Sequence, residues 1–379
     1  MHPPIYLDYN ATTPIDPEVV TEMLPYFQTH FGNPSSSYGL GRHNKQAIEK
    51  ARLQVAELIG ASPEEIVFTS CGTESNNLAI RGIAFANQGK GKHIITSSIE
   101  HPAVTEVCRN LASLGCEITW LPVDKYGTVN SEDVKKAIRP ETVLISIMHA
   151  NNEVGTIQPI AEIGAIAKEN KIIFHTDAAQ SVGKIETNVN ALGVDLLTIA
   201  GHKLYAPKGI GALYIRKGVN IEKLMFGAGH EMGRRPGTDN VPYIVGLGKA
   251  CELTRENDII IHEHIFQMRQ RLFDGLREKS VSSISLNANL ENCLPNTLSI
   301  SFANIEAHTL ASVIGEQVCI STGSACHSGS VEISPVLKAM KVERKQAAGT
   351  VRISAGKFTT EEEVDRAIQI ISEAIQNLV

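Results

Sequence analysis

Short apolar runs alternate with helical patterns between about residues 60 and 216. The runs are rich in β-branched residues and almost continuous, which is typical of strands buried on both faces of a sheet. The predicted strands are EEIVFTS (64–70), HIITS (93–97), EITWLPV (117–123), TVLISIMHA (142–150), KIIFHTDAA (171–179), DLLTIAG (195–201) and GALYIR (211–216). Helical patterns such as IAEIGAIAKEN lie between them. This alternation predicts an α/β fold with right-handed crossovers and a mainly parallel, seven-stranded sheet between helices.

The pattern changes near residue 241. A long helical stretch is predicted from near Pro242 to about Lys279. The elements predicted after it are a strand at NTLSISF (296–302), a helix near 307–317, strands at QVCIST (317–322) and TVRISAG (350–356), and a final helix after Thr360. We therefore expect a large domain of residues 15–255 and a smaller α+β domain formed by residues 1–14 and 256–379.

Composition and charge exclude several classes of protein. The chain has 379 residues, of which 42% are hydrophobic and 20% charged, and its net charge of −6 gives no reason to expect direct nucleic-acid binding. No apolar run approaches the ~20 residues of a membrane span, and MHPPIYLDYN does not resemble a signal peptide. The seven cysteines are scattered without a C-x-x-C pair. We therefore expect a cytoplasmic protein with no disulfide framework and no metal site.

Charged side chains follow two of the predicted strands, at the edge where ligands gather in open α/β sheets. Asp177 follows KIIFHT, and burying a carboxylate there is costly unless it meets a partner. Lys203 comes just after TIAGH. A lysine that enters a cleft from a buried strand loses its proton more easily, and the free amine can form a Schiff base.

A third feature is CGTES (71–75), where Gly72 and Thr73 open a predicted helix. Small residues and hydroxyl groups at a helix N-terminus make a seat for an anion. A phosphate seat, a lysine and an acid on neighbouring strand ends together indicate pyridoxal phosphate. Taken singly, each has an ordinary alternative: a turn cap, a solvated lysine and a helix cap.

The segment STGSACHSGS (321–330) carries one thiol, Cys326, among small residues. Glycine and serine let a loop move at low steric cost, and a thiolate is a nucleophile. A protonated His327 would favour that thiolate. The ordinary alternative is an incidental surface thiol. A dinucleotide-binding enzyme is disfavoured, because GAGHEMG (227–233) is one residue too long for G-x-G-x-x-G and opens no evident helix.

Several motifs along the whole chain resemble those of the cysteine desulfurase family, which comprises class V aminotransferases of pyridoxal-phosphate fold type I related to selenocysteine lyases. The matching motifs are LDYNATTP (7–14), FGNPSSSY (31–38), FTSCGTESNNLAI (68–80), EHPAV (100–104), MHANNEVGTIQP (148–159), HTDAAQSVGK (175–184), GHKLYAPKGIGALYIR (201–216), RRPGTDNVP (234–242) and STGSACHSG (321–329). The most specific are the GHK lysine motif and the SAC segment.

The resemblance implies roles around the cofactor ring. Lys203 would form the Schiff base, and Asp177 would pair with the pyridinium nitrogen. Gln180 would hydrogen-bond the ring hydroxyl oxygen, with Asn152 near the same side of the ring. His101 would stack on the ring face and move protons.

The resemblance also implies how the phosphate and the substrate are bound. Thr73 and His202 would bind the phosphate beside Gly72, joined by Thr238 from the other subunit of a homodimer. Arg352 would clamp the substrate carboxylate in a bidentate pair, with Asn152 close by.

The chain departs from the family pattern at one phosphate-binding position. Many desulfurases have serine directly before the GHK motif, and this chain has Ala200. One phosphate hydrogen bond is therefore missing, unless another group such as Thr198 supplies it.

The implied activity is conversion of L-cysteine to L-alanine, with the sulfur transferred to Cys326 as a persulfide for a sulfur-acceptor protein. The destination stays open among iron–sulfur clusters, tRNA thiolation and DNA phosphorothioation. CHS and RPGTDN look more like selenocysteine lyases, whereas the intact STGSAC and the long segment after it favour a desulfurase. The alternatives are a selenocysteine lyase, or a pyridoxal-phosphate aminotransferase-like enzyme that forms no persulfide.

Overall fold

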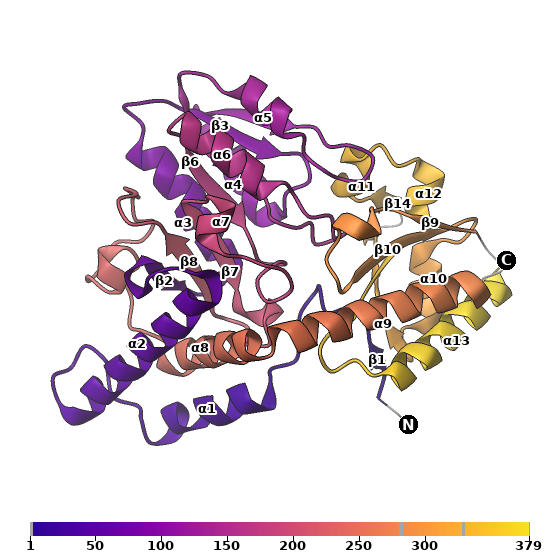
Figure 1. Cartoon of the computed structure of the whole chain (residues 1–379), viewed down its shortest axis with the longest axis horizontal. Helices are drawn as coiled ribbons and strands as arrows, with labels where there is room; N and C mark the ends of the chain where they lie inside the picture. Colours follow the sequence, from indigo (N-terminus) through magenta and orange to yellow (C-terminus); the bar gives the residue numbers. More distant parts are fainter. Residues whose placement is uncertain (1–2, 280–282, 328–329, 379) are drawn as a thin grey trace.

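The computed structural model describes residues 3–279, 283–327 and 330–378, with the backbone alone for residues 258, 324–327 and 330–332. Two sheets with their own helices lie side by side, and both chain ends lie with the smaller one (Figure 1). No helix among these residues has the length and apolar character needed to cross a membrane.

The larger sheet has seven strands in the order β2-β8-β7-β6-β5-β3-β4. Only β8 runs antiparallel to its neighbours, so the prediction of a mainly parallel sheet is confirmed. The strands are β2 (Ile66–Thr69), β3 (His93–Ser97), β4 (Glu117–Leu121), β5 (Thr142–Ser146), β6 (Ile173–Asp177), β7 (Leu196–Ala200) and β8 (Gly211–Ile215). Each lies within a predicted run.

Helices cover both faces of this sheet because successive strand residues point to opposite sides. Leu196 packs in the core beneath α3 (Gly72–Ala86) and α4 (Pro102–Ser113), whereas Leu197 packs in the core on the other face. The helices of that second face are α1 (Pro17–Gln28), α2 (Gly39–Ile59), α5 (Ser131–Ala137), α6 (Ile160–Glu169), α7 (Val189–Leu192) and α8 (Val241–Glu256). The sheet is therefore buried on both sides, as its apolar strands require.

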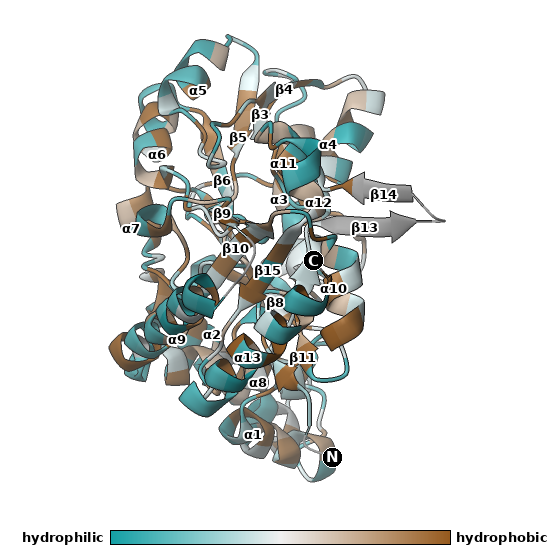
Figure 2. Cartoon of the chain, turned by 90° about the vertical axis from the view of Figure 1, so that its right-hand side faces the viewer, coloured by the Kyte–Doolittle hydropathy of each residue, from teal (hydrophilic) through white to brown (hydrophobic). Residues whose placement is uncertain are grey.

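The smaller sheet is antiparallel, in the order β12-β15-β10-β9, and it packs on a separate hydrophobic core. Its strands are β9 (Ile284–Leu286), β10 (Thr297–Phe302), β12 (Ser321–Thr322) and β15 (Thr350–Ser354). The surrounding helices are α9 (Asp258–Lys279), α10 (Ala307–Ile314), α11 (Pro335–Ala339), α12 (Arg344–Ala348) and α13 (Glu361–Leu378). Figure 2 shows mainly hydrophilic residues on the visible side of α13 and the hydrophobic strand β15 behind it.

The N-terminus joins the smaller core. Strand β1 (Ile5–Tyr6) pairs in parallel with β11 (Val318–Cys319), and Leu7 is fully buried in that core. The predicted boundary at residues 255–256 falls at the end of α8. The domain division itself stays a prediction.

Three details differ from the sequence predictions. The single helix predicted up to Lys279 is two helices, because the chain leaves helical geometry at Asn257, whose side-chain amide donates to the Leu253 carbonyl at 2.9 Å. The backbone around Cys326 forms strands rather than an open loop, since β13 (Ser324–His327) pairs antiparallel with β14 (Ser330–Ile333). Helices α1 and α2 were not predicted.

Candidate active site

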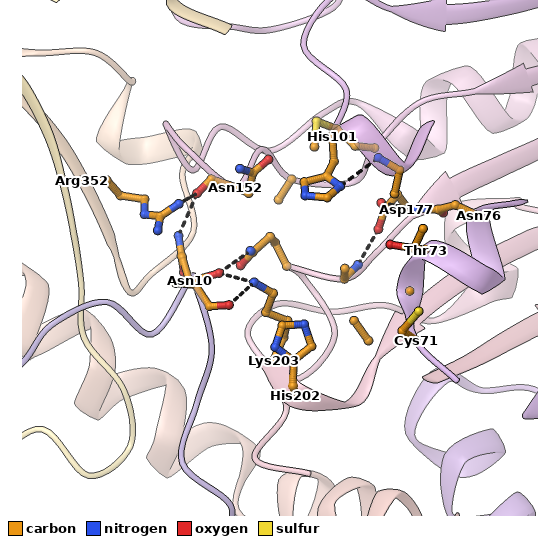
Figure 3. A pocket seen from close by; sticks show the side chains of 18 residues that line it. Asn10, Cys71, Thr73, Asn76, His101, Asn152, Asp177, His202, Lys203 and Arg352 are labelled. Atoms are coloured by element: carbon orange, nitrogen blue, oxygen red, sulfur yellow. Dashed lines mark hydrogen bonds between the residues drawn. The ribbon is translucent and has the colours of Figure 1, made fainter. Parts of the chain in front are cut away.

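A cavity of about 430 Å³ opens where β6 and β7 end, which is the edge predicted for a ligand (Figure 3). The predicted site residues that line it are Gly72, Thr73, His101, Asn152, Asp177, Gln180, His202, Lys203 and Arg352. They come from both sheets and from segments far apart in the chain. The structure therefore brings most of the predicted constellation together around one cavity.

The predicted anion seat lies at the start of α3. Cys71 is extended and the helix begins at Gly72, so the first turn directs backbone N–H groups without intrahelical partners toward the cavity wall. A side chain at Gly72 would lie 3.2 Å from the Ala200 methyl group, so a glycine lets α3 begin close to the end of β7. Thr73 follows, with its side chain exposed at the cavity.

Asp177 ends β6 and is buried with both carboxylate oxygens engaged. Asn76 donates its side-chain amide to Oδ2 at 2.7 Å, and the Ala179 N–H donates to Oδ1 at 2.9 Å. These two donors hold the carboxylate in one orientation at the cavity wall. Sequence reasoning missed Asn76, although its spacing of three from Thr73 on α3 places both residues on the same side of the helix.

Lys203 lies in a short 3₁₀ turn (Gly201–Lys203) directly after β7. Its amine donates to the carbonyl of Ala11 at 2.7 Å and to the carbonyl of Asn10. Burial, and after it the Arg352 charge, lowers the pKa of Lys203 to about 8, while the charges of Asp8 and Asp177 oppose the shift. A substantial fraction of this amine is therefore neutral near physiological pH, unlike a solvated lysine.

His101 caps the N-terminus of α4, where its Nδ1 accepts a hydrogen bond from the Ala103 N–H at 3.1 Å. This bond leaves Nε2 as the protonated nitrogen of the neutral ring. Burial lowers the pKa of His101, with a smaller contribution from Lys203, while Asp177 opposes both. His202 is also held neutral, because burial and the nearby Lys203 lower its pKa to about 4.

Asn10 is a site residue that sequence reasoning missed. Its carbonyl accepts from Lys203 and from the Gln180 amide at 2.9 Å, and its side-chain amide donates to the Thr297 hydroxyl at 2.8 Å. Lys184 was also missed: its buried amine donates to Gln180 Oε1 at 3.0 Å and to Asn10 Oδ1 at 3.3 Å, and burial lowers its pKa to about 7. The LDYNATTP and QSVGK motifs contain these residues, but no spacing rule links them.

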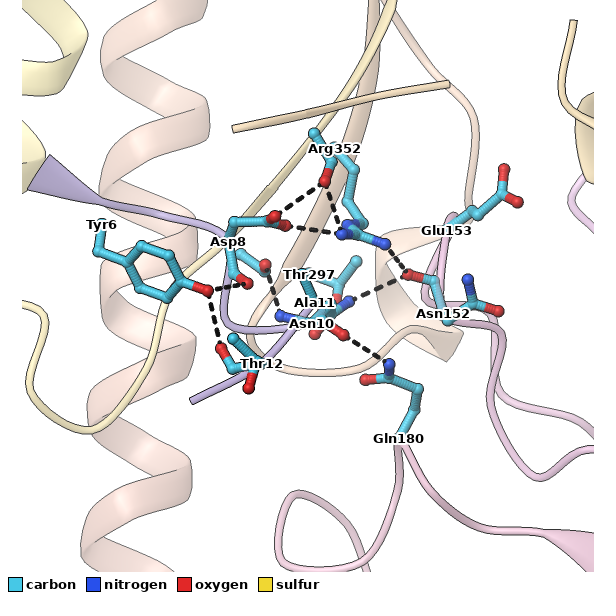
Figure 4. A network of polar contacts seen from close by, with 12 residues as sticks. Tyr6, Asp8, Asn10, Ala11, Thr12, Asn152, Glu153, Gln180, Thr297 and Arg352 are labelled. Carbon is cyan, nitrogen blue, oxygen red and sulfur yellow. Dashed lines mark hydrogen bonds and ion pairs between the residues drawn. The ribbon is translucent and has the colours of Figure 1, made fainter. Parts of the chain in front are cut away.

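Arg352 enters the cavity from β15 of the smaller sheet. It forms an ion pair with Asp8 at 2.6 Å, and it donates to the Ser321 hydroxyl and the Asn152 carbonyl, each at 2.8 Å (Figure 4). The predicted clamp for a carboxylate is thus already paired with a carboxylate of the same chain.

Two predicted residues, Thr198 and Thr238, are not among the described residues that line the cavity. Thr198 is buried with its hydroxyl 3.1 Å from His175 Nε2, so binding a phosphate would cost it that contact. Thr238 is exposed. The side chain of Cys326 lies outside the part that the structure describes. The roles of all three stay predictions. Within the described residues, no group of three or more His, Cys, Asp and Glu is arranged to hold a metal ion.

Comparisons with known proteins agree over almost the full chain. The model of the aminotransferase class-V family matches residues 5–367. A protein described as "Cysteine desulfurase IscS" from Methanosarcina thermophila is 50% identical over 375 residues, covering 99% of this chain and 92% of that protein. One of the same description from Dictyoglomus turgidum is 50% identical over 376 residues, covering 99% and 95%.

Solved structures give the same result for the fold. A NifS-like protein superposes with a TM-score of 0.93 at 41% identity, covering 99% of this chain and all of that one. The family model, the sequence identity over the full chain and the structural superposition therefore all point to the same family as the residues around the cavity. The chain belongs to the cysteine desulfurase family of class V aminotransferases.

Proposed function

We propose that the cavity around Lys203 carries out the cysteine desulfurase reaction of this family with pyridoxal phosphate, and that Cys326 receives the sulfur. The observation that carries this proposal is the placement of one half-buried amine, Lys203, and one buried carboxylate, Asp177, on a cavity that also contains a helix N-terminus. The family is dependent on pyridoxal phosphate, which supports the same reading.

The donor set of the cavity fits this cofactor. The first turn of α3 and Thr73 suit a phosphate group, because the N–H groups and the helix dipole attract an anion. Asp177, fixed by Asn76, would pair with the pyridinium nitrogen, and the Lys203 amine would form the covalent link. When bound, pyridoxal phosphate supplies an electron sink for the bonds at the substrate carbon atoms.

The chain's own residues would then orient the substrate and move its protons. Arg352 would bind the carboxylate of L-cysteine and fix the direction in which the thiol points. Lys203 would take the Cα proton, for which a pKa near neutrality suits a general base. His101, held neutral with its Nδ1 engaged by the start of α4, would present Nε2 to the reacting atoms.

The sulfur transfer conserves atoms and electrons. The Cys326 thiolate attacks the sulfur of L-cysteine, so that an S–S bond forms and the substrate C–S bond breaks. The electron pair of that C–S bond stays with Cβ, which takes up the proton given by the substrate thiol, and Lys203 returns to Cα the proton that it took. L-Cysteine and one thiolate therefore become L-alanine and one persulfide, with the transferred sulfur oxidised and Cβ reduced.

The remaining parts of the proposal concern partners. We propose a homodimer in which Thr238 serves the cavity of the other subunit, and its exposure outside its own cavity is compatible with that role. The likeness to IscS-type enzymes supports iron–sulfur cluster assembly as the destination of the sulfur. The description of these relatives as cysteine desulfurases favours L-cysteine over L-selenocysteine as substrate.

The test is the intact mass of the purified enzyme after incubation with L-cysteine in the absence of reductant. We expect a gain of one sulfur atom, and no gain in Cys326→Ser. Retention of full L-alanine production by Lys203→Ala would refute the proposed chemistry. If the enzyme retains its cofactor but gains no sulfur, the same assay with L-selenocysteine distinguishes a lyase from an aminotransferase-like enzyme.

A further inference from the structure

We propose that Asp8 is an internal competitor for the substrate carboxylate, and that it sets how tightly Arg352 binds amino-acid substrates and products. The proposal rests on the proposed function in one respect: it takes Arg352 as the group that binds the substrate carboxylate. It adds a residue, Asp8, that would determine affinity by occupying the same guanidinium.

The contacts of Arg352 account for the proposal (Figure 4). Its Nη2 donates to Asp8 Oδ1 at 2.6 Å and to Ser321 Oγ at 2.8 Å, and its Nη1 donates to the Asn152 carbonyl at 2.8 Å. Ser321 in turn donates its hydroxyl to Asp8 Oδ2 at 2.9 Å. The Nε of Arg352 is buried and has no hydrogen-bond partner among the described residues.

A guanidinium has two edges that can hold a carboxylate in a bidentate pair, one formed by Nε and Nη2 and the other by Nη1 and Nη2. Both edges require a hydrogen of Nη2. In this protein the two Nη2 hydrogens are taken by Asp8 and by Ser321. A substrate carboxylate can therefore form a bidentate pair with Arg352 only if one of those two contacts is given up.

Asp8 differs from Ser321 because it carries charge. The side chains of Arg352 and Asp8 are only 12% and 16% exposed, so water screens their attraction poorly. An incoming carboxylate thus has to compete with the Asp8 charge and also meets repulsion from it. The charged groups near Arg352 also include the Lys203 and Lys184 amines, which attract an anion, and Glu153, which repels one when it is ionised.

The backbone keeps Asp8 in this position. Asp8 pairs with Ser354 in a parallel bridge at the end of β15, two residues beyond Arg352, and the Tyr6 hydroxyl donates to the Asp8 carbonyl at 3.0 Å. The carboxylate is therefore available to take Arg352 back when a ligand leaves. An enzyme whose product is also an α-amino acid gains from this arrangement, because the ion pair that re-forms helps to release L-alanine.

The test uses Asp8→Asn, which removes the charge and keeps an oxygen that can accept from Nη2. We expect the inhibition constant of L-alanine and the KM for L-cysteine to fall roughly tenfold. Cysteamine, which has the amine and thiol of cysteine without the carboxylate, is the matched probe, and its inhibition constant should not change. Ser321→Ala frees one Nη2 hydrogen without removing charge, so its effect on L-alanine should be only about twofold.

An unchanged or weaker L-alanine affinity in Asp8→Asn would overturn the proposal, as would an equal change for cysteamine. Asp8→Ser replaces the variant if Asp8→Asn is not recovered folded. Arg352→Gln separates this failure from failure of the proposed function. If Arg352→Gln weakens the binding of L-alanine but Asp8→Asn does not strengthen it, only the proposed competition by Asp8 is wrong. If Arg352→Gln leaves L-alanine binding unchanged, the substrate role of Arg352 is wrong.

Discussion

The low pKa of Lys203 predicts how the rate of cofactor loading depends on pH. Only the neutral amine attacks an aldehyde, so the rate at which the cofactor-free protein combines with pyridoxal phosphate should follow the neutral fraction of Lys203. Burial is the main cause that lowers this pKa from 10.5 to about 8, and the Arg352 charge is the next. The rate should therefore rise with pH and level off above about pH 8.

The expected size of the effect follows from the two pKa values. At about pH 7 a lysine with a pKa of 8 is neutral in about one molecule in ten, whereas a solvated lysine with a pKa near 10.5 is neutral in about three of ten thousand. The difference is about three-hundredfold, or roughly 3 kcal/mol of differential interaction between the two protonation states. Arg352→Gln removes the positive neighbour, so it should move the midpoint of the rate profile to higher pH.

The assay is stopped-flow absorbance after the cofactor-free protein is mixed with pyridoxal phosphate across a pH series, with N-acetyl-lysine amide as the solvated reference. A midpoint of the protein profile near that of the reference compound would refute the reasoning. If the midpoint lies near pH 8 and stays unchanged in Arg352→Gln, burial alone accounts for the low pKa of Lys203, and the Arg352 charge does not contribute to it.

Two further predictions concern buried charges. Arg52 and Glu231 form a bidentate pair at 2.8 and 2.7 Å with side chains at most 7% exposed, so Arg52→Met should destabilise the protein by about 3–5 kcal/mol. Arg52→Met with Glu231→Leu should recover part of that loss in thermal unfolding, because the Ile66 carbonyl and the Phe68 N–H still lose their side-chain partners. Equal melting temperatures for the single and double variants would contradict this. Burial raises the pKa of Glu100 from 4.5 to about 8, with the Asp177 charge adding to it, so the folded protein holds a proton there that the unfolded chain releases. The stability of the wild type relative to Glu100→Gln should therefore fall as pH rises from about 4.5 to 8, by a few kcal/mol at most, and a constant difference in urea titrations would contradict it.

The strands and the strand-end chemistry could be predicted because both follow local rules. A run of β-branched residues predicts a buried strand, and Asp177 and Lys203 were found because each follows such a run. The break at Asn257 was missed because a side chain that hydrogen-bonds its own backbone leaves no mark on the hydrophobic pattern. Thr198 was named as a replacement for the missing serine hydroxyl, and it lies two residues from Ala200 on the same face of β7, but its hydroxyl is already 3.1 Å from His175 Nε2.

The missed site residues share a different cause. The contacts of Asn10 reach residues 142 to 344 positions away, and those of Asp8 reach Arg352 across 344 positions. Such pairs depend on how two separate cores are placed against each other, which neither periodicity nor local spacing encodes. Lys184 is of the same kind, since its amine donates to Asn10 across 174 positions.

The segment from Asp8 to Thr13 explains why these distant residues meet. Asp8 binds Arg352 of the smaller sheet, Asn10 binds Thr297 of the same sheet and Lys184 of the larger part, and Thr13 donates its hydroxyl to the His202 carbonyl. One short stretch of chain therefore contacts Arg352, which is the proposed substrate clamp, the buried Lys184 and the residue next to Lys203. Because the cavity walls come from both cores, the fit between them at this stretch sets the distance from clamp to amine. Substitutions at Asp8 or Asn10 should therefore change substrate affinity while leaving the two sheets intact.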